Sequence, residues 1–199
     1  MRRLTLLICL LFALFKLNSQ NKAWKLKKDK DKIQVYTRSV EGYNLAEFKG
    51  ESVFNYSVKT LATTIKDVEQ HPQWVANCDA VRLLKEEGNK MWVYSTTNAP
   101  FPLSDRDGIM LFKFQKQSNG IKVHLQSDAD YIPKKEGYVR LPYVKGFWLL
   151  ESKGENKTKV TYQIHADPGG SIPAWLANAT AVESPFETLA NLREYLKDQ

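Results

Sequence analysis

Residues 171–196, SIPAWLANATAVESPFETLANLREYL, decide the architecture of this chain. Their apolar side chains recur every three or four residues, which is the period of a helix with one apolar face. Such a helix has to cover another apolar surface. Pro185 interrupts the pattern, and Ser184 with Glu187 has the spacing of a capping box, so we expect a kink or a break rather than one straight rod. The repeating positions are Trp175, Leu176, Ala179, Val182, Phe186, Leu189, Leu192 and Leu196.

The chain before this helix alternates in the manner of half-buried strands. Apolar and polar side chains alternate in residues 33–38 and again in residues 159–165, which is the period of a strand with one dry face. Gly88-Asn89 and Asn119-Gly120 mark the turns of two hairpins. We expect further strands over residues 45–54, 81–87, 90–96, 109–116, 121–125 and 138–150, a helix over 60–69, and a turn or first helix over 25–32.

These elements predict an α+β fold in which a curved antiparallel sheet is closed by the C-terminal helix. The 199 residues suffice for one domain with a sizeable core, and 43% hydrophobic with 26% charged residues excludes a disordered chain and a membrane bundle. The net charge of +7 is spread along the chain. It favours solubility and weak attraction to anionic surfaces, and it gives no reason to expect a nucleic-acid partner.

The first twenty residues have the pattern of an export signal. A positive start, Met1-Arg2-Arg3, precedes the twelve uncharged residues 4–15, and crossing a bilayer needs roughly 20 apolar residues. We therefore expect residues 1–20 to be a signal peptide and residues 21–199 to be the mature domain, located in the periplasm or outside the cell. Without the signal, 26 basic and 22 acidic residues leave a charge of +4.

The sequence offers little support for catalysis or for a bound metal. Cys9 lies in the predicted signal and leaves Cys78 alone, so no disulfide framework is expected. The three histidines, His71, His124 and His165, have no metal-ligand spacing. With no cofactor fingerprint and no nucleophile–base pair, we expect no metal, no cofactor and no enzymatic activity.

Three segments, in this order, resemble the START (StAR-related lipid transfer) domain family. The first runs from Asp67 through Trp74 to residues 81–84, and the second is YSTTNAPFPLSDRD, residues 94–107. The third, residues 165–196, contains an Asp-Pro-Gly-Gly turn and an Ile-Pro-x-Trp-Leu helix opening. The resemblance covers nearly all of the mature chain. It implies a helix-grip fold, in which the curved sheet wraps around the long C-terminal helix and encloses an apolar cavity.

The resemblance also implies a function. A START-like domain binds a single lipid or another apolar small molecule in its tunnel and carries it between membranes or through the aqueous phase. The expected partners are the lipid and, transiently, a membrane surface, and the expected state is a monomer. Two other classes stay open: a small-ligand sensor or scaffold, and an enzyme similar to the polyketide cyclases that use the same cavity.

The resemblance to the family's Arg-Asp motif, here Arg106-Asp107, implies that Arg106 lies inside the tunnel. A buried guanidinium needs a carboxylate, a water or a ligand as partner, and strand order suggests Asp130. The alternative is an ion pair that serves the structure alone. Which further side chains face the tunnel depends on the face of the strand on which each lies. The candidates are Tyr94, Met110, Phe112, Tyr143, Trp148 and Tyr162.

The loop of residues 99–104, APFPLS, resembles the loop over the tunnel mouth in the family. Its apolar side chains, Phe101 and Leu103, and the helix interruption at Pro185 are the expected gate. A loop that is simply tucked onto the core is the alternative for Phe101 and Leu103. Trp74 and Trp175 are expected to be packing residues.

Overall fold

The computed structural model describes residues 23–43, 45–99, 101 and 103–199. The predicted signal peptide, residues 1–20, lies outside the described residues. Among the residues described, no helix is both long enough and apolar enough to cross a membrane.

Ten strands of the described chain form one sheet, in the order β1-β2-β3-β10-β9-β7-β6-β5-β4, with β8 paired to β6. Neighbours on this path are antiparallel, and the short β8 is parallel to β6. The strands are β1 (Lys25–Lys30), β2 (Ile33–Ser39), β3 (Ala46–Phe54), β4 (Cys78–Glu87), β5 (Lys90–Thr97), β6 (Arg106–Gln117), β7 (Gly120–Ser127), β8 (Val139–Arg140), β9 (Tyr143–Ser152) and β10 (Thr158–Asp167), and the helices are α1 (Val58–Lys66), the 3-10 helix η1 (Val68–Gln73) and α2 (Ala174–Tyr195).

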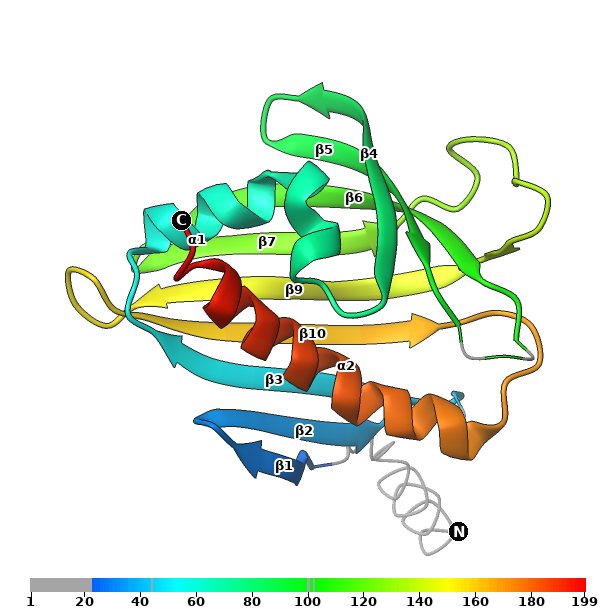
Figure 1. Ribbon diagram of the computed structural model, residues 1–199, viewed down its shortest axis with the longest axis horizontal. Coiled ribbons are helices and arrows are strands. Elements are labelled where there is room, and N and C mark those ends of the chain that lie inside the picture. Colours follow the sequence, from blue (N-terminus) through cyan, green and yellow to red (C-terminus); the bar gives the residue numbers. More distant parts are fainter. Residues whose placement is uncertain (1–22, 44, 100, 102) are drawn as a thin grey trace, which may run out of the picture.

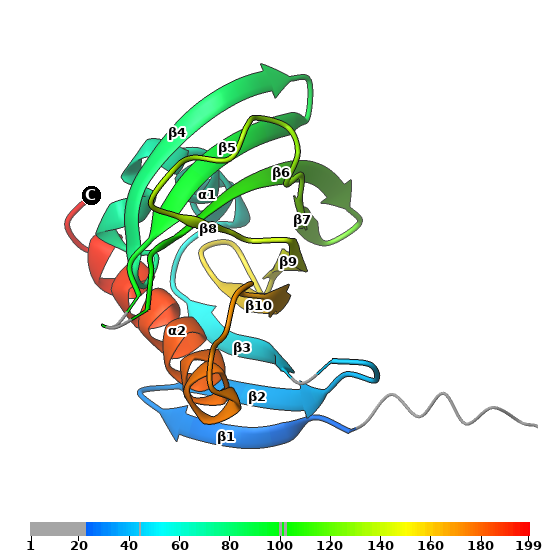
Figure 2. The same ribbon diagram turned by 90° about the vertical axis from the view of Figure 1, so that its right-hand side faces the viewer.

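The sheet is strongly curved, and α2 lies across its concave side (Figure 1). The turned view shows the strands curling around this helix, with β1–β3 on one side and β4 on the other (Figure 2). This arrangement confirms the predicted α+β helix-grip architecture. Both predicted hairpins are present. β4 turns into β5 at Gly88-Asn89 as predicted, whereas β6 turns into β7 at Ser118-Asn119, one residue before the predicted pair, and Gly120 already belongs to β7.

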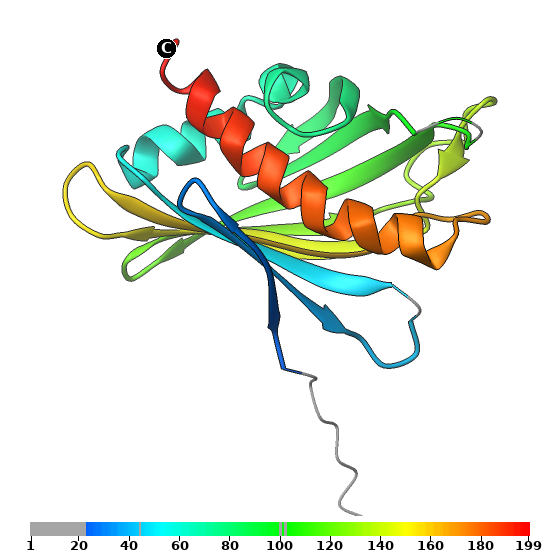
Figure 3. The ribbon, with the colours of Figure 1, turned by 60° about the horizontal axis from the view of Figure 1, so that its bottom comes forward.

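The expected break at Pro185 is absent, because α2 is a single helix from Ala174 to Tyr195 (Figure 3). The proline is buried, and it packs on β3 where that strand carries Gly50. A Cβ atom at Gly50 would lie 2.9 Å from Leu189 Cδ1 and 3.4 Å from Pro185 Cβ. Glycine thus lets the helix approach the strand closely. This packing holds the helix together where proline removes one backbone hydrogen bond.

The N-terminal segment also differs from expectation. Residues 25–32 were expected to form a turn or a first helix, but Lys25–Lys30 is edge strand β1, which pairs with β2. The hairpin turn consists of Asp31 and Lys32, with φ values of 52° and 60°. Two positive φ angles match a tight hairpin turn, but Asp-Lys is not one of the usual turn pairs, so no turn could be predicted from these two residues.

The predicted helix over residues 60–69 is divided into α1 and η1. Ser57 begins α1, where its side-chain oxygen accepts a hydrogen bond from the Thr60 amide at 3.1 Å. The core lies between α1, the C-terminal half of α2 and the concave face of the sheet. Its fully buried side chains include Leu61, Ile65, Trp74, Leu150, Leu189 and Leu192. The N-terminal half of α2 has no comparably buried leucine among its described side chains.

Candidate ligand-binding cavity

Two adjoining chambers lie on the concave side of the sheet, the outer one beneath α2 and the inner one beneath residues 71–76. The outer chamber has a volume of about 220 Å³ and the inner one about 240 Å³. Both chambers are lined by Thr97, Leu141, Ile164 and Ala166, so they adjoin each other. Together they fall within the range of about 300–1,000 Å³ that small-molecule pockets occupy.

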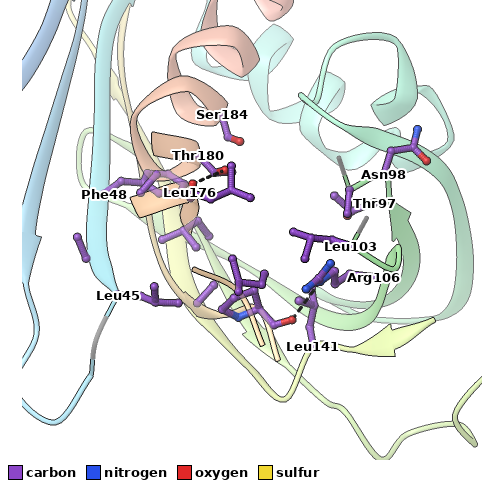
Figure 4. Close-up of a pocket in the computed structure, with 17 residues that line it drawn as sticks. Leu45, Phe48, Thr97, Asn98, Leu103, Arg106, Leu141, Leu176, Thr180 and Ser184 are labelled. Atoms are coloured by element: carbon purple, nitrogen blue, oxygen red, sulfur yellow. Dashed lines mark hydrogen bonds between the residues drawn. The ribbon is translucent and has the colours of Figure 1, made fainter. Parts of the chain in front are cut away.

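The outer chamber is bounded by the N-terminal half of α2, by β3 and β10, and by the segment that joins β5 to β6 (Figure 4). Its walls are mainly aliphatic, with Leu45, Leu103 and Leu176 from three different elements. The inward face of α2 adds Thr180 and Ser184, spaced by four residues along the helix. An apolar chamber with few polar groups suits an amphiphilic ligand.

The inner chamber is aromatic and uncharged. The rings of Trp148 and Tyr162 stack with centroids 3.9 Å apart and planes 11° apart, and Trp74 lies edge-on to Trp148 at 5.9 Å. Burial raises the pKa of the Tyr162 phenol. No Asp, Glu, Lys or Arg belongs to the described wall of this chamber. Its surface therefore suits a hydrocarbon chain.

His71 is the titratable imidazole in the wall of the inner chamber. Its Nε2 atom lies 2.9 Å from the carbonyl oxygen of Ile65. Burial lowers the pKa of His71 from 6.5 to about 4, against the opposing effects of that carbonyl and of Asp67. The imidazole is therefore neutral at pH 7, and its hydrogen bond to Ile65 places the proton on Nε2.

Arg106 begins β6, opposite Thr97 of β5, and its side chain lies in the wall of the outer chamber (Figure 4). The residue is 6% exposed. Its Nε donates a hydrogen bond to the carbonyl of Pro168 at 3.3 Å, and Nη1 donates one to the carbonyl of Ser104. Burial lowers the pKa of Arg106, and the nearby Asp105 opposes this shift. An arginine with so high an intrinsic pKa stays charged.

The next residue, Asp107, points to the opposite face of the sheet. Its carboxylate accepts two hydrogen bonds from Arg140, from Nε at 2.8 Å and from Nη2 at 2.9 Å. Arg140 also donates to the carbonyls of Ala129, Ile132 and Pro133. The pair holds the loop of residues 128–138 over the convex face. Sequence reasoning missed this ion pair, because no spacing motif connects the two residues.

The structure does not bring Asp130 to Arg106, which corrects the suggested pairing. Asp130 is exposed and follows β7 in the loop over the convex face. It raises the pKa of Arg140, which lies nearer. In the described chain, no carboxylate lies within 4.0 Å of the Arg106 guanidinium.

Four of the six candidate lining residues face the inner chamber: Met110, Phe112, Trp148 and Tyr162. The other two, Tyr94 and Tyr143, lie on the opposite face, which corrects their assignment. On β5 the side chains that line the cavity are Val93, Ser95 and Thr97, and alternate residues of a strand point to opposite faces. Tyr94 lies near Asp107, and Tyr143 packs against Tyr43 and His165.

Of the three residues that were expected to form the gate, the structure places one in the chamber wall and two elsewhere. Leu103 lines the outer chamber, whereas Phe101 is 97% exposed. Pro185 packs against β3 and is not part of the described chamber walls, which corrects its assignment to the gate. Trp74 is a core residue as expected, but Trp175, also expected to pack, is 73% exposed.

The lining residues that sequence reasoning missed come mainly from α2. Leu176, Thr180 and Ser184 recur every four residues, so they share one helix face. Two hydroxyl side chains on an otherwise apolar face are a signal that the sequence already contained. Ile164 and Ala166 of β10 were missed because their inward orientation depends on the strand register.

Comparison with known proteins adds evidence that is independent of this geometry. Residues 11–199 match the model of the START domain. An uncharacterized protein of Pseudomonas aeruginosa is 38% identical over 88% of both chains. The phosphatidylcholine transfer protein of Bos taurus is 29% identical over 80% of this chain and 77% of its own. The crystal structure of a STAR-related lipid transfer protein from Xanthomonas axonopodis superposes with a TM-score of 0.82, at 42% identity, over 87% of this chain and 98% of that one.

Breaking the ion pair on the convex face should destabilise the fold. Asp107→Asn leaves the buried Arg140 guanidinium without its counter-charge, which typically costs about 3–5 kcal/mol. The free energy of unfolding, measured in urea, should fall by this amount. The exposed pair of Lys66 and Glu86 is the control, because Glu86→Gln should cost less than about 1 kcal/mol. Equal losses in both variants would contradict a structural role for the buried pair.

Acid should destabilise the protein through His71. The folded state holds this imidazole neutral with a pKa of about 4, whereas the unfolded chain binds a proton near pH 6.5. Stability is therefore lost as the pH falls below 6.5, by about 2 kcal/mol at pH 5. Urea unfolding of His71→Gln should show a shallower pH dependence than that of the native sequence. An unchanged slope between pH 7 and pH 5 would show that His71 is not the responsible group.

Proposed function

Because the chain belongs to the START domain family, we propose that it binds a single lipid in the two adjoining chambers and carries it between membranes or through the aqueous phase. The observation that carries the proposal is that an outer chamber containing one cation adjoins an aromatic, uncharged inner chamber. The names of the bovine and Xanthomonas relatives, both lipid transfer proteins, support it.

Hydrophobic burial supplies the free energy that this function needs. Each methylene that leaves water for an apolar environment contributes roughly 0.8 kcal/mol. A lipid tail in the inner chamber exchanges the bilayer interior for a surface made of Trp148, Phe112 and Met110. Since both environments are apolar, loading and unloading are both feasible. Transfer then needs a route into the chamber and no covalent chemistry.

We propose a carrier and not an enzyme. The imidazole in the cavity wall, His71, is neutral, and its proton is engaged by the Ile65 carbonyl. Asp105 precedes the cavity residue Arg106, and its carboxylate accepts a hydrogen bond from the Ala99 amide at 2.9 Å. These contacts stabilise the walls and leave neither group placed to transfer a proton to a ligand.

Exposed aromatic residues beside the outer chamber support transient membrane contact. Phe101 is exposed while Leu103, two residues later, lines the chamber. Trp175 is exposed while the adjacent Leu176 lines it. Each segment thus presents one apolar side chain outward and another inward. We propose that Phe101 and Trp175 enter the membrane interface and bring the chamber mouth to the lipid.

We also propose that the protein is exported as a monomer and acts in the periplasm or outside the cell. The support is the positive start and the apolar run of residues 4–15, too short to span a bilayer. In that location a carrier would meet membrane surfaces directly.

Native mass spectrometry of the protein purified from its own host without detergent tests the lipid carrier. We expect one lipid per chain, identified after solvent extraction. Ala181→Phe should remove most of the bound lipid because Ala181 lines the outer chamber. Ala179→Phe is the matched control, since Ala179 is exposed on the same helix and its variant should stay loaded. A protein that is empty, and that takes up neither a fluorescent sterol nor a fluorescent phospholipid, would exclude the carrier.

Transfer between vesicles tests the proposed membrane contact. Replacing Phe101 or Trp175 with Ser removes apolar surface worth roughly 1.5–3 kcal/mol when fully buried, so each variant should slow transfer about tenfold. Val53→Ser is the control, because Val53 is 44% exposed at the opposite end of β3 from the chamber. The lipid content of all three variants should equal that of the native protein. Unchanged transfer rates would place the contact surface elsewhere.

A further inference from the structure

The described walls of the cavity carry one positive charge that forms no ion pair. Among the described residues that line either chamber, Arg106 is the charged side chain, and the imidazole of His71 is neutral. Both recorded hydrogen bonds of Arg106 go to backbone carbonyls, of Pro168 and Ser104. Carbonyl oxygens accept hydrogen bonds without cancelling the charge.

The neighbouring carboxylates form no ion pair with Arg106, although burial lowers its pKa and the charge of Asp105, beyond 4.0 Å, partly opposes this shift. Asp105 is engaged by the Ala99 amide, and it does not come within 4.0 Å of the guanidinium. Asp107 faces the other side of the sheet and is paired with Arg140. Asp130 is exposed on that same side. A buried cation that lacks a counter-ion is costly, so a bound anion would relieve a cost that the folded chain carries.

The position of Arg106 also orients a ligand. Thr97 lies opposite Arg106 on the neighbouring strand, and it lines both chambers (Figure 4). An anionic group bound at Arg106 would have this hydroxyl beside it. Beyond Thr97 the inner chamber offers the rings of Phe112 and Trp148. A head group near the guanidinium thus has its hydrocarbon chain directed into the apolar chamber.

The described walls hold no evident place for a second, cationic group on the ligand. Proteins bind quaternary ammonium groups with carboxylates or with open cages of aromatic rings. The aromatic side chain of the outer chamber is Phe48 alone among the residues described. In the inner chamber Trp148 is stacked on Tyr162 and Trp74 lies edge-on to Trp148, so these rings form pairs and not an open cage, and no carboxylate is among the described lining residues of either chamber.

We propose that this protein selects lipids of net negative charge, whose phosphate or carboxylate head group binds Arg106, over zwitterionic choline lipids. The inference rests on the proposed function and specifies its substrate class. An arginine binds phosphate or carboxylate oxygens through two parallel hydrogen bonds. A net anion neutralises the cavity, whereas a choline lipid brings a further cation that has no partner in the described walls.

Competition within a single vesicle tests this inference. Vesicles of equal parts dioleoylphosphatidylglycerol and dioleoylphosphatidylcholine present both lipids with identical acyl chains and one common surface charge. Protein purified from its own host is incubated with them, separated, and its lipid is extracted and quantified by mass spectrometry. We expect at least about tenfold enrichment of the phosphatidylglycerol, equivalent to roughly 1.4 kcal/mol.

The variants assign the selectivity to its residue. Arg106→Gln should abolish the enrichment, and Arg106→Lys, which keeps the charge, should retain part of it. Arg82→Gln is the matched control, since Arg82 is exposed on β4 and contacts the ring of Tyr94 on the convex face. Its enrichment should equal that of the native protein. Thermal unfolding verifies that each variant is folded before its lipid is measured. If the Arg106→Gln variant is not folded, the test relies on the Arg106→Lys variant.

Each outcome of these measurements tests a different part of the proposal. Equal loading of the two lipids would overturn the selectivity and leave the carrier function intact. Enrichment that survives in Arg106→Gln would overturn the role of Arg106. Loading of neither lipid would overturn the carrier function together with the selectivity. An excess of inorganic phosphate should not displace the bound lipid, and displacement would identify a site for the free anion instead.

Discussion

The unequal contact between α2 and the sheet is the constraint on which the rest of this structure depends. At its C-terminal half the helix lies so close to β3 that a side chain at Gly50 would displace the side chain of Leu189. At its N-terminal half, Leu176, Thr180 and Ser184 face a chamber instead of packed strands. The close end supplies cohesion. The open end supplies volume that a ligand can fill, which a uniformly packed helix would not leave.

Hydrogen bonds on the other side of the helix support this arrangement. The Thr188 hydroxyl accepts a bond from the Ala76 amide at 3.1 Å, in the segment that leads into β4. The helix is thereby tied to β3 through Gly50 and to the opposite limb of the curved sheet through Ala76. Curvature of the sheet and position of the helix thus depend on each other, and the cavity is enclosed by elements far apart in sequence.

Arg106 and Asp107 have different roles because they lie on opposite faces of the sheet. Adjacent residues on β6 necessarily point to opposite faces, so Arg106 enters the cavity wall while Asp107 is bonded to Arg140 on the convex side. The structural ion pair and the cavity cation are therefore different residues. Asp107 lies on the opposite face of the sheet from Arg106, so Arg106 has no ion-pair partner among the described residues.

The sequence by itself determined the helix period of residues 171–196, the presence of the two hairpins and the alternation of the strands, because these patterns follow from local backbone geometry. The resemblance to the family added the position of Arg106 in the cavity. Only the tertiary structure decided that Tyr94 and Tyr143 face outward, that Pro185 lies within a continuous helix, and that Asp130 is distant from Arg106. A one-residue change of register reverses the face of every side chain on a strand, and register depends on pairing between segments distant in the chain.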